Sequence, residues 1–208
     1  MRSAEPGRRA LLGAGQRLLA EEPLTRLSIN AITAEAKMAK GSFYQHWRSR
    51  HEFFLALHRT FHDELLRIVS TRMTHQPPGL ERLTIGMNTY LDVCLAEPAT
   101  KALLVQARTD AGLADEVAVR NQQAAGIVIA DLEAIGWQSP EPVAILLIAA
   151  IAEAALQELT TGGRREDLRD ALIRLADRPT AVSTARADSG DRGMLCTIRD
   201  RTGISGTE

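Results

Sequence analysis

The chain has 208 residues, enough for one domain or two small ones, with 45% hydrophobic and 25% charged residues and a net charge of −1. These fractions are ordinary for a soluble globular protein, and the low aromatic content with abundant Ala and Leu favours helices over sheets. Cys94 and Cys196 lie far apart and match no metal spacing. Nothing in this pattern suggests a disulfide framework, and a reducing cytoplasm is the simplest interpretation.

No targeting or membrane segment is expected. The N-terminus carries arginines but lacks the sustained apolar run of a secretory signal. The most apolar stretch, Val143 to Leu156, is too short to span a bilayer and contains Glu153. We interpret it as a buried helix and expect no membrane partner.

Charge is distributed unevenly along the chain. Residues 1–62 hold ten Lys or Arg and five Asp or Glu, a balance of +5, and the remainder holds 15 and 21, a balance of −6. A basic N-terminal part on an acidic body is typical of a polyanion-binding head, although chance alone can produce such an excess.

Apolar periodicity predicts helices along most of the chain. Ser28 is a good N-cap for the second helix, and Ser49 with Glu52 forms a capping-box pattern before the fourth. Pro and Gly residues close most helices. The expected helices span about residues 7–21, 29–36, 40–47, 50–74, 80–96, 99–108, 113–135, 141–160 and 165–177.

The sequence therefore predicts an all-α fold of about nine helices. We expect a three-helix N-terminal domain over residues 5–65 and a helical body over residues 66–178. Residues 179–208 are rich in Ser, Thr, Gly, Asp and Arg, which predicts a disordered tail.

The stretch from Leu27 to Trp47 carries the most information about function. Two short helices with a tight break between them are what a helix-turn-helix requires, and the second helix then enters the major groove. Phe43 and Trp47, four residues apart, are expected to be buried together. Gly41 lacks a side chain, so the backbone there can approach DNA closely.

These residues resemble the TetR family of regulators. The family pattern is a Ser or Thr cap, an apolar pair, Ala, a short turn, Lys-Gly, aromatic residues with His or Tyr, and a second cap. The resemblance is specific over about residues 8–58. The matching residues are Ser28, Ile29, Ile32, Ala36, Met38, Lys40, Gly41, Phe43, Tyr44, His46, Trp47, Ser49, Arg50, Glu52 and Phe53.

The resemblance implies roles for individual residues in a DNA-binding motif over residues 28–47. Tyr44 and His46 would contact phosphates, and Lys40 a phosphate or a base edge. Ser42 and Gln45 would read bases, since Gln pairs well with adenine. Ser28 and Thr33 would touch the DNA backbone.

Two positions in the turn depart from the family pattern. Lys37 stands where the family usually has Gly, and a left-handed Lys costs about 1 kcal/mol or more. Either the turn is distorted or Lys37 serves as an extra phosphate contact. Ala39 replaces a Ser or Thr cap worth about 1 kcal/mol. Both departures point to weaker DNA binding and leave the fold unaffected.

Other chemistries find less support. His58 and His62 have metal-ligand spacing, but no third ligand is obvious, so a packing or surface role is favoured. No nucleophile–base motif, phosphate loop or dinucleotide fingerprint is present, so we expect neither an enzyme nor a cofactor.

By the same resemblance, the body would bind a small effector and dimerise through its last two long helices. Glu153, an acid in an apolar helix, is expected to pair, neutralise or meet a ligand, and Arg108 and Arg169 are candidate partners. Each of the candidate pocket residues could also be an ordinary core or surface residue. The candidates are Met87, Tyr90, Leu91, Cys94, Leu104, Arg108, Asn121, Ile127, Trp137 and Glu153.

The expected function is ligand-controlled repression by a homodimer on double-stranded DNA with a palindromic operator. Activation is a lesser variant. The alternative is a small-molecule-binding helical protein with weak or lost operator binding. Lys37 and Ala39 are the features that point to this alternative.

Overall fold

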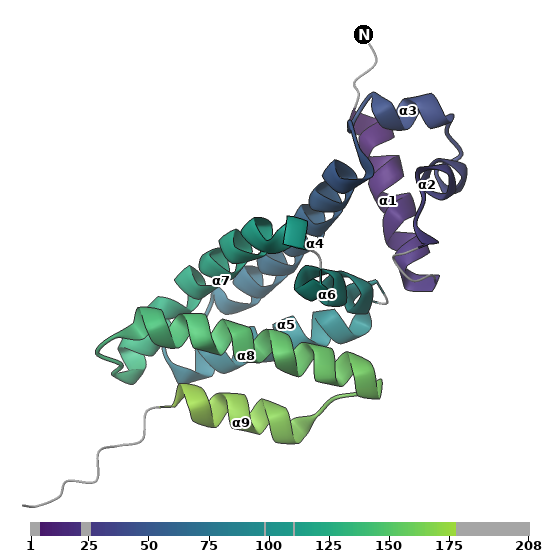
Figure 1. Ribbon diagram of the computed structural model, residues 1–208. Helices are drawn as coiled ribbons and strands as arrows, with labels where there is room; N and C mark the ends of the chain where they lie inside the picture. Colours follow the sequence, from purple (N-terminus) through teal and green to yellow (C-terminus); the bar gives the residue numbers. More distant parts are fainter. Residues whose placement is uncertain (1–4, 22–25, 98, 110, 178–208) are drawn as a thin grey trace, which may run out of the picture. The chain divides into compact units, whose positions relative to one another are not determined.

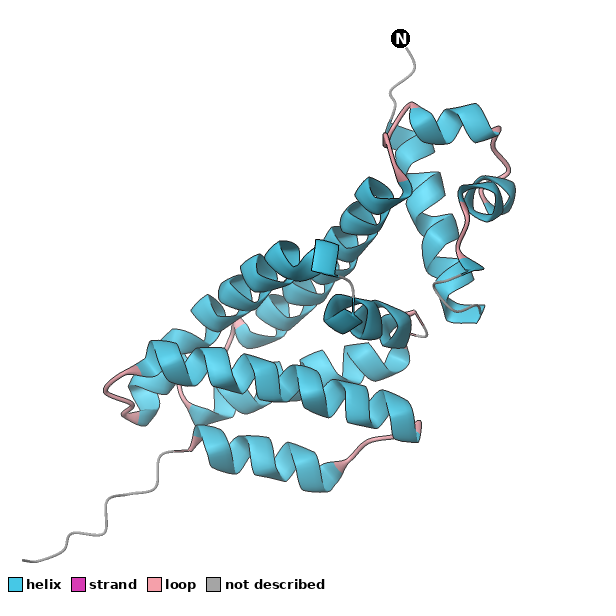
Figure 2. Ribbon diagram, viewed as in Figure 1, coloured by secondary structure: helices cyan, strands magenta, loops and turns pink. Residues whose placement is uncertain are grey.

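The computed structural model describes residues 5–21, 26–97, 99–109 and 111–177, which contain helices and no strand (Figures 1 and 2). The all-α prediction is confirmed, and the predicted helix ends shift by at most three residues. The helices are α1 (Glu5–Glu21), α2 (Ile29–Glu35), α3 (Lys40–Tyr44), α4 (Arg50–Met73), α5 (Leu80–Ala96), α6 (Thr100–Thr109), the 3₁₀ turn η2 (Ala111–Leu113), α7 (Ala114–Ile135), α8 (Pro140–Thr161) and α9 (Glu166–Ala176).

The largest difference from prediction is the early end of α3. After Tyr44 the chain tightens, because Gln45 and His46 donate to carbonyls only three residues back. This turn carries Trp47 into the core and leaves Ser49 free to cap α4. The Ser49 side chain accepts from the Glu52 N–H at 3.1 Å, and the Glu52 carboxylate accepts from the Arg48 N–H. The predicted capping pattern is therefore present.

An aromatic cluster joins the N-terminal helices to α4. Phe43 and Phe53 are fully buried, and Trp47 meets Phe53 edge-on with ring centroids 4.9 Å apart. The predicted joint burial of Phe43 and Trp47 is confirmed, at 5.6 Å between centroids. Each such pair stabilises the fold by about 1 kcal/mol beyond the contribution of burying the two rings.

Gly15 allows α1 to lie close against α4. A Cβ at this position would stand 2.7 Å from Cζ of Phe53. Glycine at this helical position thus has a packing reason, because any side chain would push the Phe53 ring away.

The body is built around α8, which packs against α5, α6, α7 and α9 (Figure 1). Two buried acids are neutralised between its helices. Glu158 in α8 accepts two hydrogen bonds of 2.7 Å from Arg169 in α9. Asp131 in α7 accepts from Arg82 and from the Gly79 N–H, which joins α7 to the start of α5.

Helix α8 is longer than the apolar run that the sequence suggested. It has 22 residues and contains an 18-residue window with a mean hydropathy of 1.8, so by length and composition alone it passes as a membrane span. The apolar run Val143–Leu156 is too short by itself, but it lies within a helix that is long enough to pass the length test. Its buried face contains Ala144, Leu147 and Ile151, which join the core of the body, and Glu158 pairs there with Arg169. These contacts are those of a core helix.

The expected domain boundary at residues 65/66 falls inside α4, so the two predicted domains share one helix. The described residues between 5 and 177 belong to one compact unit. The predicted disordered tail lies outside the described residues, as does Pro23.

Candidate functional site

The turn between α2 and α3 is held by backbone hydrogen bonds. The Ser28 hydroxyl caps α2 by accepting from the Ala31 N–H at 3.1 Å, as predicted. At the other end, the Met38 N–H donates to the Thr33 carbonyl at 2.8 Å. Lys37 lies between these elements with φ 55°, the single positive φ outside glycine among the described residues. The left-handed Lys expected in the family's Gly position is therefore present.

Helix α3 begins without a side-chain cap. Ala39 occupies the N-cap position in an extended conformation and makes no capping hydrogen bond. The sequence prediction that α3 lacks a side-chain cap is confirmed. The first N–H groups of α3 therefore donate to no capping side chain. Uncapped N–H groups at the start of a helix are donors from which a phosphate can accept.

The first turn of α3 is open to an approaching partner. Lys40 and Gly41 are exposed, and a Cβ at Gly41 would meet nothing within 4 Å. The fold itself therefore does not require glycine here. A glycine at this position would allow an external backbone to approach closely.

The outer face of the motif is aromatic and basic. Tyr44 is 52% exposed beside the buried Phe43, and Gln45 is also exposed. Lys37 and Arg48, which flank α3 in the sequence, are exposed as well. An exposed tyrosine next to lysine and arginine is the composition expected of a phosphate-contacting surface.

Ser42 and His46 are half-buried, so each exposes only part of its side chain. The His46 ring packs against α1, where its Nε2 lies 3.0 Å from the position of a Cβ on Gly7. His46 therefore joins α1 to the end of α3 and presents only one side of its ring.

Thr33 requires a correction. It is 3% exposed, and its hydroxyl donates to the Ile29 carbonyl at 2.9 Å. A threonine with this burial does not reach a DNA backbone in this conformation. Helical periodicity places Thr33 one residue after the inward-facing Ile32, and the tight packing of α2 on its neighbours buries both.

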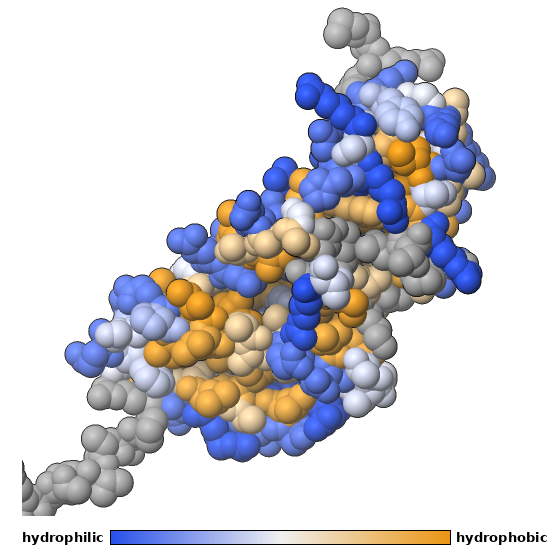
Figure 3. All heavy atoms as spheres, in the orientation of Figure 1, coloured by the Kyte–Doolittle hydropathy of each residue, from blue (hydrophilic) through white to orange (hydrophobic). Residues whose placement is uncertain are grey.

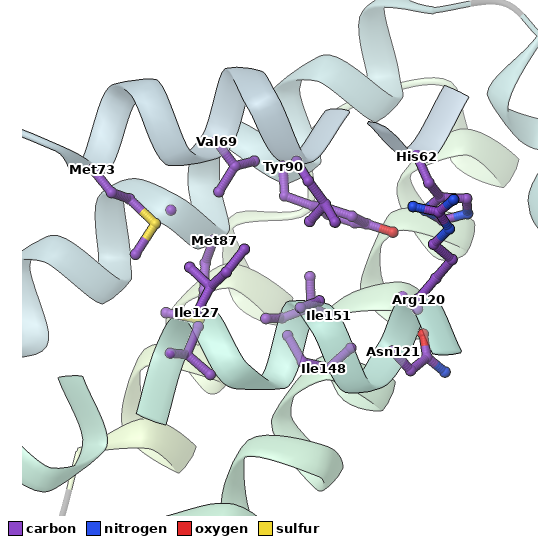
Figure 4. A pocket seen from close by; sticks show the side chains of 15 residues that line it. His62, Val69, Met73, Met87, Tyr90, Arg120, Asn121, Ile127, Ile148 and Ile151 are labelled. Carbon is purple, nitrogen blue, oxygen red and sulfur yellow. The ribbon is translucent and has the colours of Figure 1, made fainter. Parts of the chain in front are cut away.

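A second candidate site lies inside the body. A cavity of about 60 Å³ adjoins a larger one of about 190 Å³, and both are lined by His62, Tyr90, Arg120, Asn121 and Ala152. We call these the small and the large chamber. Val69, Met73, Met87, Ile127, Ile148 and Ile151 contribute apolar walls to the small chamber (Figure 4).

The polar end of the cavity holds two stacked histidines of α4. His58 lines the large chamber, and its ring lies 4.5 Å, centroid to centroid, from that of His62. Burial lowers the pKa of His58, and burial with the nearby His58 and Arg120 lowers the pKa of His62 to about 3. Both imidazoles are therefore neutral at physiological pH.

An ion network beside these histidines links α4 to α7. Glu116, which is buried, accepts from Arg59 of α4 at 2.7 Å and from Arg120 at 2.9 Å. Arg120 also pairs with Asp63 of α4. The Arg59 hydrogen bond is the main cause that lowers the pKa of Glu116. A ligand that displaces Arg120 from its place in the cavity would therefore also disturb the ion pairs that hold α4.

The predicted pocket residues divide into two groups. Met87 and Ile127 line the small chamber, Leu104 and Arg108 line the large one, and Tyr90 and Asn121 line both. The others do not line either chamber. Leu91 and Cys94 are core residues, the Trp137 Nε1–H donates to the Ala176 carbonyl, and Glu153 is exposed.

Glu153 pairs with Arg108 at 2.7 Å, so the choice between the two candidate arginines is resolved. The Gln157 hydrogen bond, followed by that from Arg108, lowers the pKa of Glu153. Burial raises the pKa of the Cys94 thiol to about 12, which makes it an unreactive core residue.

Sequence reasoning missed the part of His58, His62 and Arg120 in the cavity. The i,i+4 spacing of the histidines was read only as a metal pattern, and within the described residues no cluster of three potential ligands forms. One signal was available. His58 and His62 share a face with Phe54 and Phe61, a face that has to be buried.

Helices α2 and α3 form a two-helix motif, and the first turn of α3 is exposed. Such a motif on a helical body defines a DNA-binding protein of the transcription-regulator class. Residues 11–57 match the family described as bacterial regulatory proteins, tetR family. Residues 11–57 are thus a DNA-binding domain of the TetR family, as the motif residues predicted.

Solved structures share this fold over most of the chain. A transcriptional regulator from Rhodococcus sp. Rha1 is 24% identical with a TM-score of 0.70, covering 81% of this chain and 93% of its own. The multidrug binding protein EbrR, solved with imidazole, is 20% identical with a TM-score of 0.68, covering 84% and 97%. RolR, solved with resorcinol, is 16% identical with a TM-score of 0.63, covering 86% and 96%. No curated protein matches the chain significantly.

Proposed function

We propose that the chain is a ligand-responsive repressor, and not an enzyme, that binds a palindromic operator as a homodimer. The observation that carries the proposal is the open first turn of α3, where Gly41 is unexplained by packing and Tyr44 is exposed. Lys40 and Tyr44 would hold phosphates, and Gln45 with Ser42 would read base edges in the major groove.

The homodimer proposal rests on an apolar face of α8 and α9 (Figure 3). Ile145 and Leu146 in α8 are 60% and 71% exposed, and Leu175 in α9 is 62% exposed. Large apolar side chains gathered in this way mark an interface. A two-fold operator also requires a two-fold protein. Leu146→Glu should convert the dimer to monomer in sedimentation, whereas the exposed Val119→Glu on α7 should not.

The effector would bind in the two chambers of the body. EbrR and RolR, which share the fold, were solved with small molecules. A ligand between α4, α5, α7 and α8 would act on α4, which begins directly after the motif, and would favour the conformation with lower DNA affinity.

A gel shift with DNA from upstream of the chain's own gene tests the proposal. Binding should weaken steeply with salt, because each neutralised phosphate contributes about −0.9 to the slope of log K against log salt. Absence of binding at low salt would contradict operator recognition and would favour the alternative, a small-molecule-binding protein with lost operator binding. The strained Lys37 and the uncapped Ala39 are the observations that support this alternative.

A further inference from the structure

His58 is a buried polar side chain without a partner. It is fully buried, and neither Nδ1 nor Nε2 has a hydrogen-bond partner. Leaving such a group unsatisfied costs about 1–3 kcal/mol. His58 lines the large chamber, but its two nitrogens are covered in this conformation. A rotation of the ring that turns one nitrogen toward the chamber would let an occupant supply the missing hydrogen bond.

The charges around the chambers favour an uncharged occupant. Arg120 is held by Glu116 and Asp63, and Arg108 is held by Glu153. The two arginines are therefore already neutralised by acids. A carboxylate ligand would find no unpaired cation among these residues, and an ammonium ligand would find no unpaired acid.

A neutral imidazole has one N–H donor and one acceptor nitrogen. A hydroxyl group complements either, because it both donates and accepts. The Tyr90 hydroxyl points to the same end of the cavity, where His62 and Arg120 lie (Figure 4). The polar end thus offers several neutral hydrogen-bonding groups to one hydroxyl.

The volumes limit the size of the ligand. An engineered apolar cavity of about 150 Å³ holds benzene. The large chamber, at about 190 Å³, therefore accepts one ring, and the small chamber, at about 60 Å³, accepts a short alkyl group. Ile148, Ile151 and Met87 line the small chamber and suit such a group.

We infer that the effector is a phenol with a short alkyl substituent, whose hydroxyl bonds to His58 and whose alkyl group fills the small chamber. This inference rests on the proposed function and specifies its ligand. The ring would lie among His58, His62 and Tyr90, and its hydroxyl would satisfy the nitrogen that the fold leaves without a partner.

Calorimetric titration of the full chain without DNA tests the ligand class. The probes are para-propylphenol, propylbenzene, para-propylbenzoate and para-propylbenzylamine, which share size and differ in the polar group. We expect para-propylphenol to bind at least ten-fold more tightly than each of the others. Equal or tighter binding of propylbenzene or of either ion would overturn the inference.

Two substitutions locate the contact. His58→Leu removes the unsatisfied group, so the free protein should melt at an unchanged or higher temperature, while the preference for the phenol over propylbenzene is lost. His58→Gln, which keeps a donor and an acceptor, should retain the preference and guards against a folding defect in the first variant. If His58→Leu keeps the preference, the histidine has only a structural role or bonds to a trapped water, and the inference fails.

Ala152→Phe provides the control for location, because Ala152 lines both chambers and a larger side chain would fill them. It should abolish binding of every probe. A gel shift with and without para-propylphenol separates the two proposals. If the phenol binds in calorimetry but does not release DNA, the ligand assignment is supported and only the proposal of ligand-induced release is contradicted. DNA release by other compounds, with no phenol binding, overturns the ligand assignment alone.

Discussion

His58 and His62 stack one turn apart on α4 with ring centroids 4.5 Å apart, and the same helix begins at Arg50, directly after the DNA-binding motif. The ligand chambers and the DNA-reading helix are therefore connected through a single element. The ion pairs from Glu116 and Arg120 to Arg59 and Asp63 fasten that element to α7.

The buried histidines should make the protein less stable as the pH is lowered. Burial lowers both pKa values from the ordinary 6.5, that of His62 to about 3, so the unfolded chain takes up protons first as the pH decreases. Their contribution is complete above about pH 6.5. Below that pH, the contribution of His62 declines toward pH 3 by up to about 1.4 kcal/mol per pH unit, and that of His58 changes in the same direction. Urea unfolding between pH 5 and 6.5 should show a shallower decline for His62→Gln. Equal slopes would contradict the buried neutral pair.

The turn before α3 should gain stability from Lys37→Gly. Lys37 has φ 55°, a conformation that costs a side chain about 1 kcal/mol. Thermal unfolding should therefore show a stabilisation of up to about 1 kcal/mol. If Lys37 contacts phosphate, Lys37→Gly and Lys37→Asn should both reduce the salt slope of DNA binding by about one. An unchanged slope in both variants would exclude that contact.

A cap at Ala39 should strengthen α3. Ala39 has the extended backbone of an N-cap but no side-chain acceptor, so Ala39→Ser should stabilise the protein by about 1 kcal/mol. Ser28→Ala, which removes the existing cap on α2, should cost about the same. Denaturant midpoints measure both effects. A lower midpoint for Ala39→Ser would show that the short helix is limited by something other than its cap.

Two glycines should respond oppositely to alanine. Gly15→Ala places a Cβ 2.7 Å from Phe53 and should cost about 1–3 kcal/mol. Gly41→Ala meets nothing within 4 Å, so it should leave stability unchanged or raise it by up to about 1 kcal/mol while weakening DNA binding strongly. Full DNA affinity in a stable Gly41→Ala protein would remove the argument for close backbone approach.

Removing one partner of the buried ion pair between α8 and α9 should destabilise the protein more than replacing both partners. Arg169→Met leaves Glu158 buried without its partner and should cost about 3–5 kcal/mol. Arg169→Met with Glu158→Gln removes the buried charge and keeps an acceptor for the Arg165 N–H, so it should recover most of that loss. Recovery of none of it in chemical unfolding would show that Arg169 acts mainly through Asn88 and Asp92.

Local signals were sufficient to predict the N-terminal motif. The caps at Ser28 and Ser49, the joint burial of Phe43 and Trp47, and the left-handed Lys37 depend on residues close together in the chain. The error at Thr33 arose because periodicity alone does not fix which faces of a short helix are covered.

The body was less predictable because its site depends on contacts between distant segments. His58 and Arg120 meet across α4 and α7, and only their packing reveals that His58 lacks a partner. Apolar candidates such as Leu91 and Cys94 are indistinguishable in sequence from Met87, yet they lie in the solid core. Glu158 was overlooked because its partner, Arg169, lies on the next helix.

Selection of duplexes from a random DNA pool by the purified full chain tests the central claim most directly. We predict enrichment of a two-fold symmetric sequence, lost when Tyr44→Ala and Gln45→Ala are combined, both at exposed positions that the fold does not need. Failure of the wild-type chain to enrich any sequence above that double variant at low salt would contradict operator recognition by α3.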